Sequence, residues 1–518
     1  MGGRWQWIDA HFSCLPSQSN VYGLTTFSKA DGTTKLLTGC MNGKVMSVEY
    51  HKHSDKLRPS SREIQFTYIP GDAELVAIDA FRKVFHDDEL IIGIAFLKLE
   101  ENENKTCQFL NIYSSWEKEL DLKPNSDQVT PICQYLKLEF IPYQLTHTQL
   151  ITKNSKETVF LLSGNDKKVH LYREDVSLEH SFMEVSVVEY FPEFQTITSC
   201  ILWINIVYVD KNKQRITARG HQNGEIIVFL VEPLSKVILK QFSICHDGPI
   251  TRVLLFTSES KVAVPACLEH LGLESNTECD VSDYHLLVVS AVEHSVVYKN
   301  VLDKEFSDQL LLPDSNKSDC VMCACAVDID FDGQNELLLG TYGQELLAYK
   351  FQTIAPQEPA SPIDNFDELQ TMNSRRKAYS FSVSSKKMYK YTTGDLTSTP
   401  KTVYKDDSSM PDNWNINSYS PEVDIISDMF NTRPSFSKGQ PQAGYQLLWH
   451  RSFASPVVAV EHADVMGDGM DDLIVLTLKG LHILQPNLTN VAEICFNKLN
   501  ALLNSSMSND EDEKREAT

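Results

Sequence analysis

The chain contains 518 residues, of which 42% are hydrophobic and 23% are charged, a composition typical of a globular protein with a sizeable core. Acidic residues outnumber Lys and Arg by 70 to 47, so the formal net charge at pH 7 is −23. Such a charge repels phosphate backbones and argues against nucleic acid as a partner of the whole chain. At this length we expect either several domains or one large repeat architecture.

Targeting signals are absent from the sequence pattern. The first residues contain no apolar segment typical of a secretory signal, and no apolar run approaches the roughly 18 residues of a membrane span. The 12 cysteines are scattered and do not form a dense disulfide framework. We therefore expect a soluble, reduced, intracellular protein with no transmembrane segment.

A short apolar strand, a turn and a second strand recur along the chain. Seven such hairpins are predicted, in TTKLLTGCMNGKVMSVEY from Thr33, ELIIGIAFLKL from Glu89 with FLNIYSS from Phe109, ETVFLLSGNDKKVHLYRE from Glu157, QRITARGHQNGEIIVFLVE from Gln214, YHLLVVSAVEHSVVYKNV from Tyr284, NELLLGTYGQELLAYKF from Asn335 and DDLIVLTLKGLHILQ from Asp471. Asn-Gly, Gly-Asn-Asp and Lys-Gly at several junctions tolerate the positive φ angles that tight turns require.

Each hairpin is accompanied by a further apolar strand. These strands lie in segments that begin at Ser19, Glu74, Glu139, Ile197, Pro249, Val321 and Pro456. Strand–hairpin units that repeat around a ring predict an all-β, seven-bladed β-propeller, although the pattern leaves six or eight blades open. The chain contains no Trp-Asp dipeptide, which argues against the WD class of propellers.

The long gap before the last unit contains an insertion, residues 352–442. These 91 residues hold 8 of the 21 prolines and few aliphatic side chains, so we expect a disordered loop. The predicted division of the chain is an N-terminal segment (1–18), blades one to six (19–351), the insertion (352–442), the last blade (443–487), a C-terminal helix (488–508) and an acidic tail (509–518).

The predicted C-terminal helix carries an apolar stripe. Its members are Val491, Ile494, Cys495, Leu499, Leu502 and Leu503, which helical periodicity places on one face. This face is a candidate partner-binding surface, and packing against the chain's own propeller is the equal alternative.

The segment VDIDFDGQNEL places Asp328, Asp330, Asp332 and Glu336 at positions 1, 3, 5 and 9 of a loop between strands. Calcium prefers six to eight oxygen ligands, and this loop offers several carboxylates, so calcium is the candidate cofactor. The pattern resembles the FG-GAP repeat of integrin-type propellers, whose loops bind calcium. The alternative is a tight turn built from Asp and Gly, with no cofactor.

A second segment, ADVMGDGMDDL, contains Asp464, Asp468 and Asp472 in similar positions. Met466 stands where the first loop has a carboxylate, so this loop has one ligand fewer. We expect it to be the weaker calcium candidate.

No catalytic residues are predicted. The sequence has no nucleophile elbow, zinc-protease helix motif or phosphate-binding loop, and the histidines His147, His170, His221 and His462 are expected to be structural. Cys320, Cys323 and Cys325 lack the second pair of ligands that a structural zinc site needs, so core packing is expected there.

One basic patch within the insertion opposes the global charge. Its residues are Arg375, Arg376, Lys377, Lys386, Lys387 and Lys390, in a stretch without acidic residues. The patch could contact an anionic membrane or acidic actin, and the alternative is a linker with incidental charge.

Several segments together resemble the kaptin family. They are SQSNVYGL from Ser17, FTYIPGDAE from Phe66, ETVFLLSGNDKKVHLY from Glu157, DGPITRV from Asp247, DQLLLPDS from Asp308, TYGQELLAYK from Thr341 and LKGLHILQ from Leu478. They run from the first predicted blade to the last. The insertion is the departure from the family, so the resemblance implies nothing about the basic patch.

The resemblance implies a propeller subunit of the KICSTOR complex. This complex is described as holding the GATOR complex at the lysosomal surface and restraining the mTOR kinase complex when amino acids or glucose are scarce. Another subunit is a second FG-GAP propeller protein, so pairing of two propellers is expected. The family is also described as actin-associated, in lamellipodia and stereocilia.

Three functions therefore remain open from the sequence. The first is a non-catalytic scaffold that represses mTOR signalling, located in the cytoplasm and peripherally at the lysosomal membrane. The second is an F-actin-binding protein of actin-rich cell projections. The third is a calcium-dependent, ligand-binding propeller.

Overall fold

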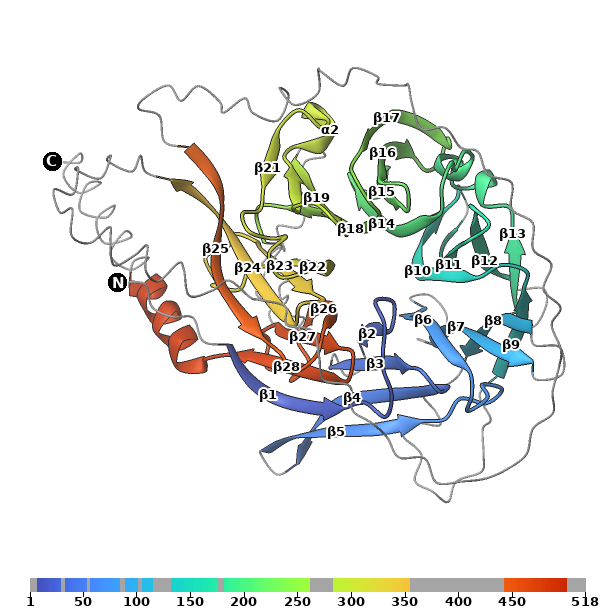
Figure 1. The fold of residues 1–518 in the computed structure, drawn as a ribbon, viewed down its shortest axis with the longest axis horizontal. Helices are drawn as coiled ribbons and strands as arrows, with labels where there is room; N and C mark the ends of the chain where they lie inside the picture. The colour runs from blue at the N-terminus through green and yellow to red at the C-terminus, as the bar shows by residue number, and fades with distance from the viewer. Residues whose placement is uncertain are drawn as a thin grey trace, which may run out of the picture. The chain divides into compact units, whose positions relative to one another are not determined.

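The computed structural model describes residues 7–28, 33–53, 56–83, 89–100, 105–114, 132–153, 155–175, 181–260, 283–354 and 442–500. Their strands form seven four-stranded sheets, which surround a central axis as the blades of a propeller (Figure 1). The prediction of an all-β, seven-bladed propeller is confirmed.

Six blades are formed by four strands that are consecutive in the chain. In order from the axis outward they are β2 (Leu24–Ser28), β3 (Thr34–Cys40), β4 (Lys44–His53) and β5 (Lys56–Ile64); β6 (Glu74–Arg82), β7 (Leu90–Glu100), β8 (Lys105–Ser114) and β9 (Ile132–Leu138); β10 (Pro142–Ile151), β11 (Lys156–Gly164), β12 (Val169–Asp175) and β13 (Ser181–Val185); β14 (Ile201–Val209), β15 (Gln214–His221), β16 (Glu225–Glu232) and β17 (Val237–Cys245); β18 (Ile250–Thr257), β19 (Tyr284–Ser290), β20 (Val296–Tyr298) and β21 (Gln309–Leu311); β22 (Val321–Val327), β23 (Glu336–Thr341), β24 (Glu345–Ile354) and β25 (Gln442–Ser452).

The seventh blade joins the two ends of the ring. It consists of β26 (Val457–Ala463), β27 (Asp472–Thr477), β28 (Gly480–Pro486) and, as its outer strand, β1 (Trp7–Cys14). Short helices lie between blades, namely η1 (Val187–Glu189), η2 (Pro192–Phe194) and α2 (Val301–Lys304), and residues 488–500 are helical after β28. We call residues 488–500 the C-terminal helix.

The seven predicted hairpins are the second and third strands of the seven blades. In the second blade, for example, Phe96 of β7 lies opposite Phe109 of β8, as the paired segments predict. In the sixth, Leu338 of β23 lies opposite Ala348 of β24. The additional apolar strands form the inner strands, from β2 to β26.

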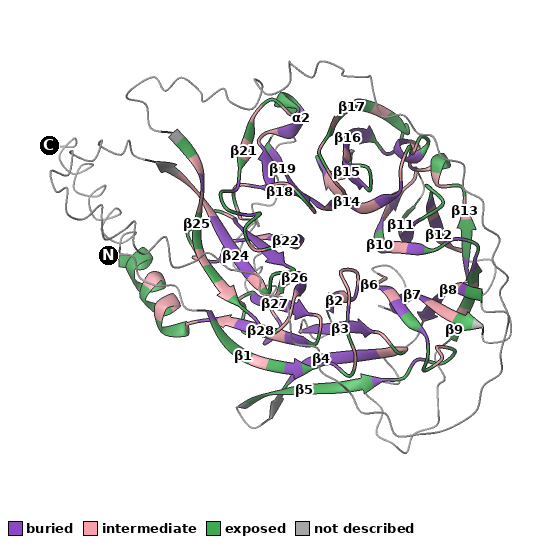
Figure 2. Cartoon of the chain, in the orientation of Figure 1, coloured by how far each residue is buried: buried purple, intermediate pink, exposed green. Residues whose placement is uncertain are grey.

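The hydrophobic core consists of layers between neighbouring blades. One cluster contains β3, β7 and β8 residues of blades one and two, and another contains β15, β18 and β19 residues of blades four and five. Because each blade is covered on both faces, its second strand is buried along most of its length, as in β19, β23 and β27. Figure 2 shows this burial, with exposed residues concentrated on outer strands such as β5 and β17.

Small residues allow the inner strand of one blade to approach the second strand of the previous blade. A Cβ atom at Gly220 of β15 would lie 2.5 Å from the Ile250 side chain of β18. A Cβ atom at Gly340 of β23 would lie 2.5 Å from Val457 of β26. The glycines that end the apolar runs of these second strands therefore serve close packing between blades.

The ring is closed by antiparallel pairing of β1 with β28, from Trp7 opposite Pro486 to Cys14 opposite Gly480. Trp7 is 8% exposed and belongs to the cluster between blades six and seven. Arg451 of β25 donates a hydrogen bond of 2.9 Å to the Trp7 carbonyl and pairs with Asp9 at 3.3 Å. The expected N-terminal segment (1–18) thus supplies a strand of the last blade, and the first part of the expected last blade (443–487) supplies β25 of the sixth.

Four side chains connect blades across the central axis. The Tyr22 hydroxyl, from blade one, donates a hydrogen bond of 2.7 Å to the Leu202 carbonyl of blade four. Tyr22 stacks on Trp203 at 5.6 Å, and the Arg252 guanidinium of blade five lies 4.3 Å from the Trp203 ring. Arg252 also pairs with Glu461 of blade seven at 3.1 Å. We call these four residues, Tyr22, Trp203, Arg252 and Glu461, the axial chain.

The expected insertion falls between β24 and β25. Apart from its ends, which belong to these two strands, residues 352–442 lie outside the described part of the chain. The basic patch, Arg375, Arg376, Lys377, Lys386, Lys387 and Lys390, and the acidic tail lie outside it as well.

Replacement of Trp7 tests the contribution of ring closure. We expect Trp7→Ala to lower the free energy of unfolding by about 3 kcal/mol, because it empties a large buried site beside β25 and β28. Ile8→Ala is the matched control, since Ile8 lies on the same strand and is 49% exposed, and it should cost less than about 1 kcal/mol. Urea denaturation followed by tryptophan fluorescence and circular dichroism measures both; equal losses would contradict a structural role of Trp7.

Candidate functional site

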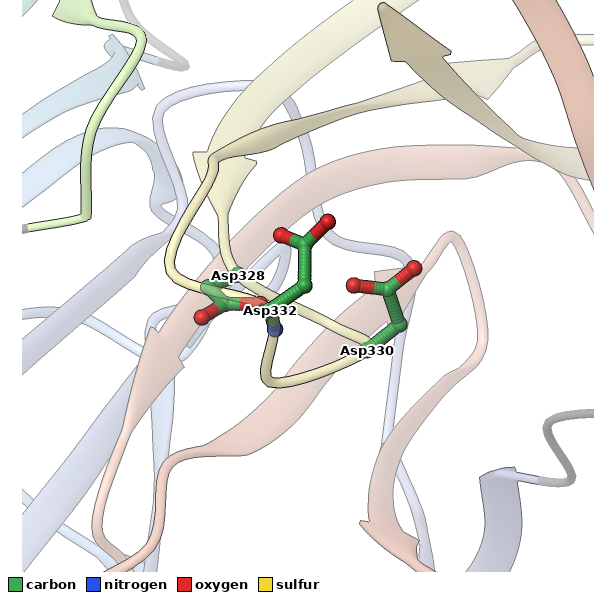
Figure 3. Close-up of side chains that lie close together, drawn as sticks. All are labelled: Asp328, Asp330 and Asp332. Carbon is green, nitrogen blue, oxygen red and sulfur yellow. Dashed lines mark hydrogen bonds between the residues drawn. The ribbon is translucent and has the colours of Figure 1, made fainter. Parts of the chain in front are cut away.

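The first acidic loop follows β22 and returns the chain to β23. The Asp328 carboxylate accepts hydrogen bonds from the backbone N–H groups of Asp332 at 3.1 Å and Gly333 at 2.8 Å, so it holds the turn from inside. Gly333 has a φ of +93°, which favours glycine. Carboxylate oxygens of Asp328, Asp330 and Asp332 lie within 4.8 Å of one another, close enough to share a cation (Figure 3).

Lys350 of β24 lies against these carboxylates. Its Nζ atom is 2.6 Å from Asp330 Oδ2, 2.7 Å from Asp332 Oδ2 and 2.8 Å from Glu336 Oε1. The second Glu336 oxygen accepts the Ile329 N–H at 2.9 Å, and this side chain is fully buried. The predicted residues Asp328, Asp330, Asp332 and Glu336 are thus brought together, and a lysine that the loop motif does not contain completes the cluster.

Burial and the lysine act in opposite directions on this cluster. Burial raises the pKa of Glu336 to about 7, despite its hydrogen bond with Lys350. Although burial alone would raise it, the pKa of Asp332 is lowered, chiefly by the Lys350 hydrogen bond. The pKa of Lys350 is raised, because its three acidic partners outweigh its burial. Lys350 therefore remains an ammonium ion at neutral pH.

The second acidic loop uses its carboxylates differently. Asp464 accepts three backbone N–H groups, from Gly467 at 2.6 Å, Asp468 at 3.1 Å and Gly469 at 2.8 Å. Asp472 accepts the N–H groups of Val465 and Met466 at 3.2 and 3.3 Å.

The Asp468 carboxylate accepts the Met470 N–H at 3.0 Å and an N–H of Gln485 at 3.2 Å. Burial raises the pKa of Asp472 to about 7. The three predicted residues Asp464, Asp468 and Asp472 therefore organise a turn, as the alternative interpretation of this loop expects.

The C-terminal helix begins after Asn487, whose side chain accepts the Thr489 N–H at 3.0 Å and caps the first turn. One side of the helix faces the propeller: Val491 and Ile494 are half-buried, and Lys498 Nζ donates a hydrogen bond to the Phe331 carbonyl of the first acidic loop. Packing on the chain's own propeller, one of the two alternatives, is therefore present for this side.

Another side of the C-terminal helix is exposed to solvent. Leu488, Phe496 and Leu499 are 54%, 64% and 60% exposed. Cys495 is also exposed, and Leu502 and Leu503 lie outside the described residues. We call Leu488, Phe496 and Leu499 the outer helix face.

A cavity of about 680 Å³ lies between the C-terminal helix and the ends of several inner strands. Its lining is mainly apolar and includes Leu254, Phe256 and Met470 from the propeller and Val491 and Ile494 from the helix. Lys498 and Asp471 are among its charged lining residues. The helix thus forms one wall of this cavity.

Two features that could suggest enzymatic chemistry have structural explanations. Ser258 Oγ lies 2.6 Å from Nε2 of His285, but Nδ1 of that ring accepts the Asn300 N–H at 2.9 Å. Nε2 therefore carries the proton and donates to Ser258, so this histidine cannot act as its base. Cys323 and Cys325 are buried, and burial raises the pKa of Cys323 to about 12, which disfavours the thiolate that a metal needs.

The residues that sequence reasoning missed are Lys350 and Lys498. Lys350 interrupts the apolar third strand ELLAYKF, and an isolated lysine in such a strand is the signal that could have indicated a buried acidic partner. Within the described part of the chain, no helix is long and apolar enough to cross a membrane.

The buried histidine His221 predicts a pH dependence of stability. Burial lowers its pKa from 6.5 to about 4, with the Arg219 charge acting in the same direction. The unfolded chain thus binds this proton more readily than the folded chain. The stability that neutral His221 contributes is present above pH 6.5 and is lost as the pH falls towards 4.

His221→Asn removes the titrating group and retains a donor for the Ser199 carbonyl, which His221 Nδ1 contacts at 3.0 Å. We expect urea denaturation to give a shallower decline in unfolding free energy between pH 6.5 and 4 for this variant, by roughly 3 kcal/mol across the interval. Parallel curves for the variant and the natural chain would contradict the prediction.

Comparison with known proteins agrees with the architecture described above. The family model described as "KICSTOR complex protein kaptin" matches residues 7–396 and 416–496, which include strands of all seven blades. A mouse protein named KICSTOR complex protein kaptin is 35% identical over 492 residues, covering 95% of this chain and 91% of its own length. The chain therefore belongs to the kaptin family of KICSTOR complex proteins.

Proposed function

We propose that this chain is a non-catalytic scaffold subunit of a KICSTOR complex. In this role it helps to hold the GATOR complex at the lysosomal membrane and restrains the mTOR kinase complex when amino acids or glucose are scarce. The observation that carries the proposal is family membership across all seven blades, since the family model extends from β1 to the C-terminal helix.

The site chemistry supports a scaffold more than an enzyme. In the described part of the chain, the acidic loop is neutralised by a lysine and the Ser258–His285 pair has the wrong tautomer for base catalysis. A rigid ring with two faces and a rim offers separate surfaces to several proteins. These properties suit a subunit that works by binding other subunits.

The outer helix face is the proposed contact with a second propeller subunit of the complex. Its three apolar side chains are more than half exposed, while the opposite side of the same helix is held to the propeller by Lys498. Exposed apolar side chains that cluster on one short element mark protein interaction sites. The membership of a multi-subunit complex supplies the class of partner, a protein surface with a complementary apolar groove.

Affinity purification from starved cells tests this proposal. We expect the tagged chain to recover a second FG-GAP propeller protein and GATOR subunits, identified by mass spectrometry. Phe496→Asp combined with Leu499→Asp should reduce recovery of the second propeller at least tenfold, because it places charge in a buried apolar contact. The melting temperature should stay unchanged, since both side chains are exposed.

Leu311→Asp is the matched control, because Leu311 is 57% exposed and lies on the outer strand of blade five. It should leave recovery unchanged. Equal recovery from all variants would move the interface from the helix to the propeller. Recovery of actin and its regulators without KICSTOR or GATOR proteins would contradict the scaffold function itself.

A further inference from the structure

The structure assigns to Lys350 the role that a divalent cation has in acidic loops of this pattern: its ammonium group is the built-in counter-ion of Asp330, Asp332 and Glu336. Three oxygens from three carboxylates surround one nitrogen at 2.6 to 2.8 Å. An ammonium group has three N–H donors, so each oxygen receives one of them. The position between the carboxylates is therefore occupied by a group of the chain itself.

The strand register explains why this lysine reaches the loop. Leu337 of β23 lies opposite Tyr349 of β24, so the next positions, Glu336 and Lys350, are also neighbours across the two strands. Glu336 begins β23 directly after the loop. The lysine side chain is 14% exposed, so the cation approaches from the blade and not from solvent.

Steric and electrostatic arguments exclude a calcium ion at the same position. Calcium requires six to eight oxygens at about 2.3–2.6 Å, and Asp330, Asp332 and Glu336 would have to supply several of them. With Lys350 in place, a divalent ion would lie next to an ammonium group and share its acceptors. Lys498, which binds the Phe331 carbonyl, adds a second positive charge beside Asp332.

The second acidic loop provides an internal comparison. Its Asp464 and Asp472 carboxylates are directed to backbone N–H groups, and none of its three aspartates has a lysine partner in the described residues. Calcium-type sequence patterns are thus retained in both loops as turns, and the one that has converging carboxylates also has a lysine. The inference concerns the chemistry of the loop and does not depend on the proposed function in a complex.

Removal of the lysine should uncover a latent divalent-cation site. We expect the melting temperature of the natural full-length chain to be the same in excess calcium and in excess EGTA. Lys350→Met should melt lower than the natural chain in EGTA, and calcium should raise its melting temperature saturably, by roughly 2 °C or more. Differential scanning calorimetry with calcium titration measures this shift.

Two variants serve as controls. Lys350→Arg retains the positive charge and should not respond to calcium. Lys350→Met combined with Asp330→Asn lacks both the lysine and one carboxylate, so its calcium response should be lost or strongly weakened. A calcium-induced shift in the natural chain would overturn the proposal, because it would mean that the lysine does not exclude the ion.

A folded Lys350→Met variant that responds to neither calcium, magnesium nor manganese would also overturn it, since the carboxylates would then not form a cation site. If this variant is unstable in EGTA, expression and purification with calcium throughout give the same discrimination. Folded protein obtained only with calcium supports the proposal, and no folded protein in either condition contradicts it.

Discussion

Closure of the ring by the pairing of β1 with β28 is the constraint on which the remaining structure depends. A blade has two apolar faces, and each face is buried only if a neighbouring blade covers it, so an open ring would expose two of the inter-blade layers. Trp7 fills one of these layers, between blades six and seven, and Arg451 attaches its backbone to β25. The two ends of the fold therefore stabilise each other, although they lie more than 400 residues apart in the chain. The glycines at Gly220 and Gly340 serve the same requirement, because they allow adjacent blades to approach closely enough to exclude water.

Much of the fold could be predicted from the sequence, and the reason is burial on both faces. The second and third strands consist of near-continuous apolar runs, such as Tyr284–Ser290 in β19, which stand out from their polar turns. The outer strands could not be predicted in the same way, because solvent covers one of their sides: Lys56–Ile64 in β5 and Val237–Cys245 in β17 are mostly polar or alternating. The pairing of β1 with the last blade and of β25 with the sixth also escaped prediction, since local patterns do not specify which distant strand an edge strand joins.

The candidate site could be predicted in part. The spacing of Asp328, Asp330 and Asp332 indicated a loop with converging carboxylates, and the structure has this geometry. The spacing could not identify the cation, because Lys350 reaches the loop from another strand and through a cross-strand register. The amphipathic pattern likewise predicted the C-terminal helix but not its orientation. A pattern with apolar residues around more than half of a helix does not decide which of them face the propeller, as Val491 does, and which remain exposed, as Phe496 does.

The axial chain has a consequence for how such a ring can serve several proteins at once. Tyr22, Trp203, Arg252 and Glu461 meet across the centre, so the side chains of blades one, four, five and seven obstruct the passage that an open propeller would have. A peptide tail cannot be threaded from one face to the other, and the two faces are separate chemical environments. A protein bound to one face therefore does not compete sterically with a protein bound to the other. Such a ring can act as a rigid spacer that fixes the distance between two attached machines, with each attachment gained or lost independently.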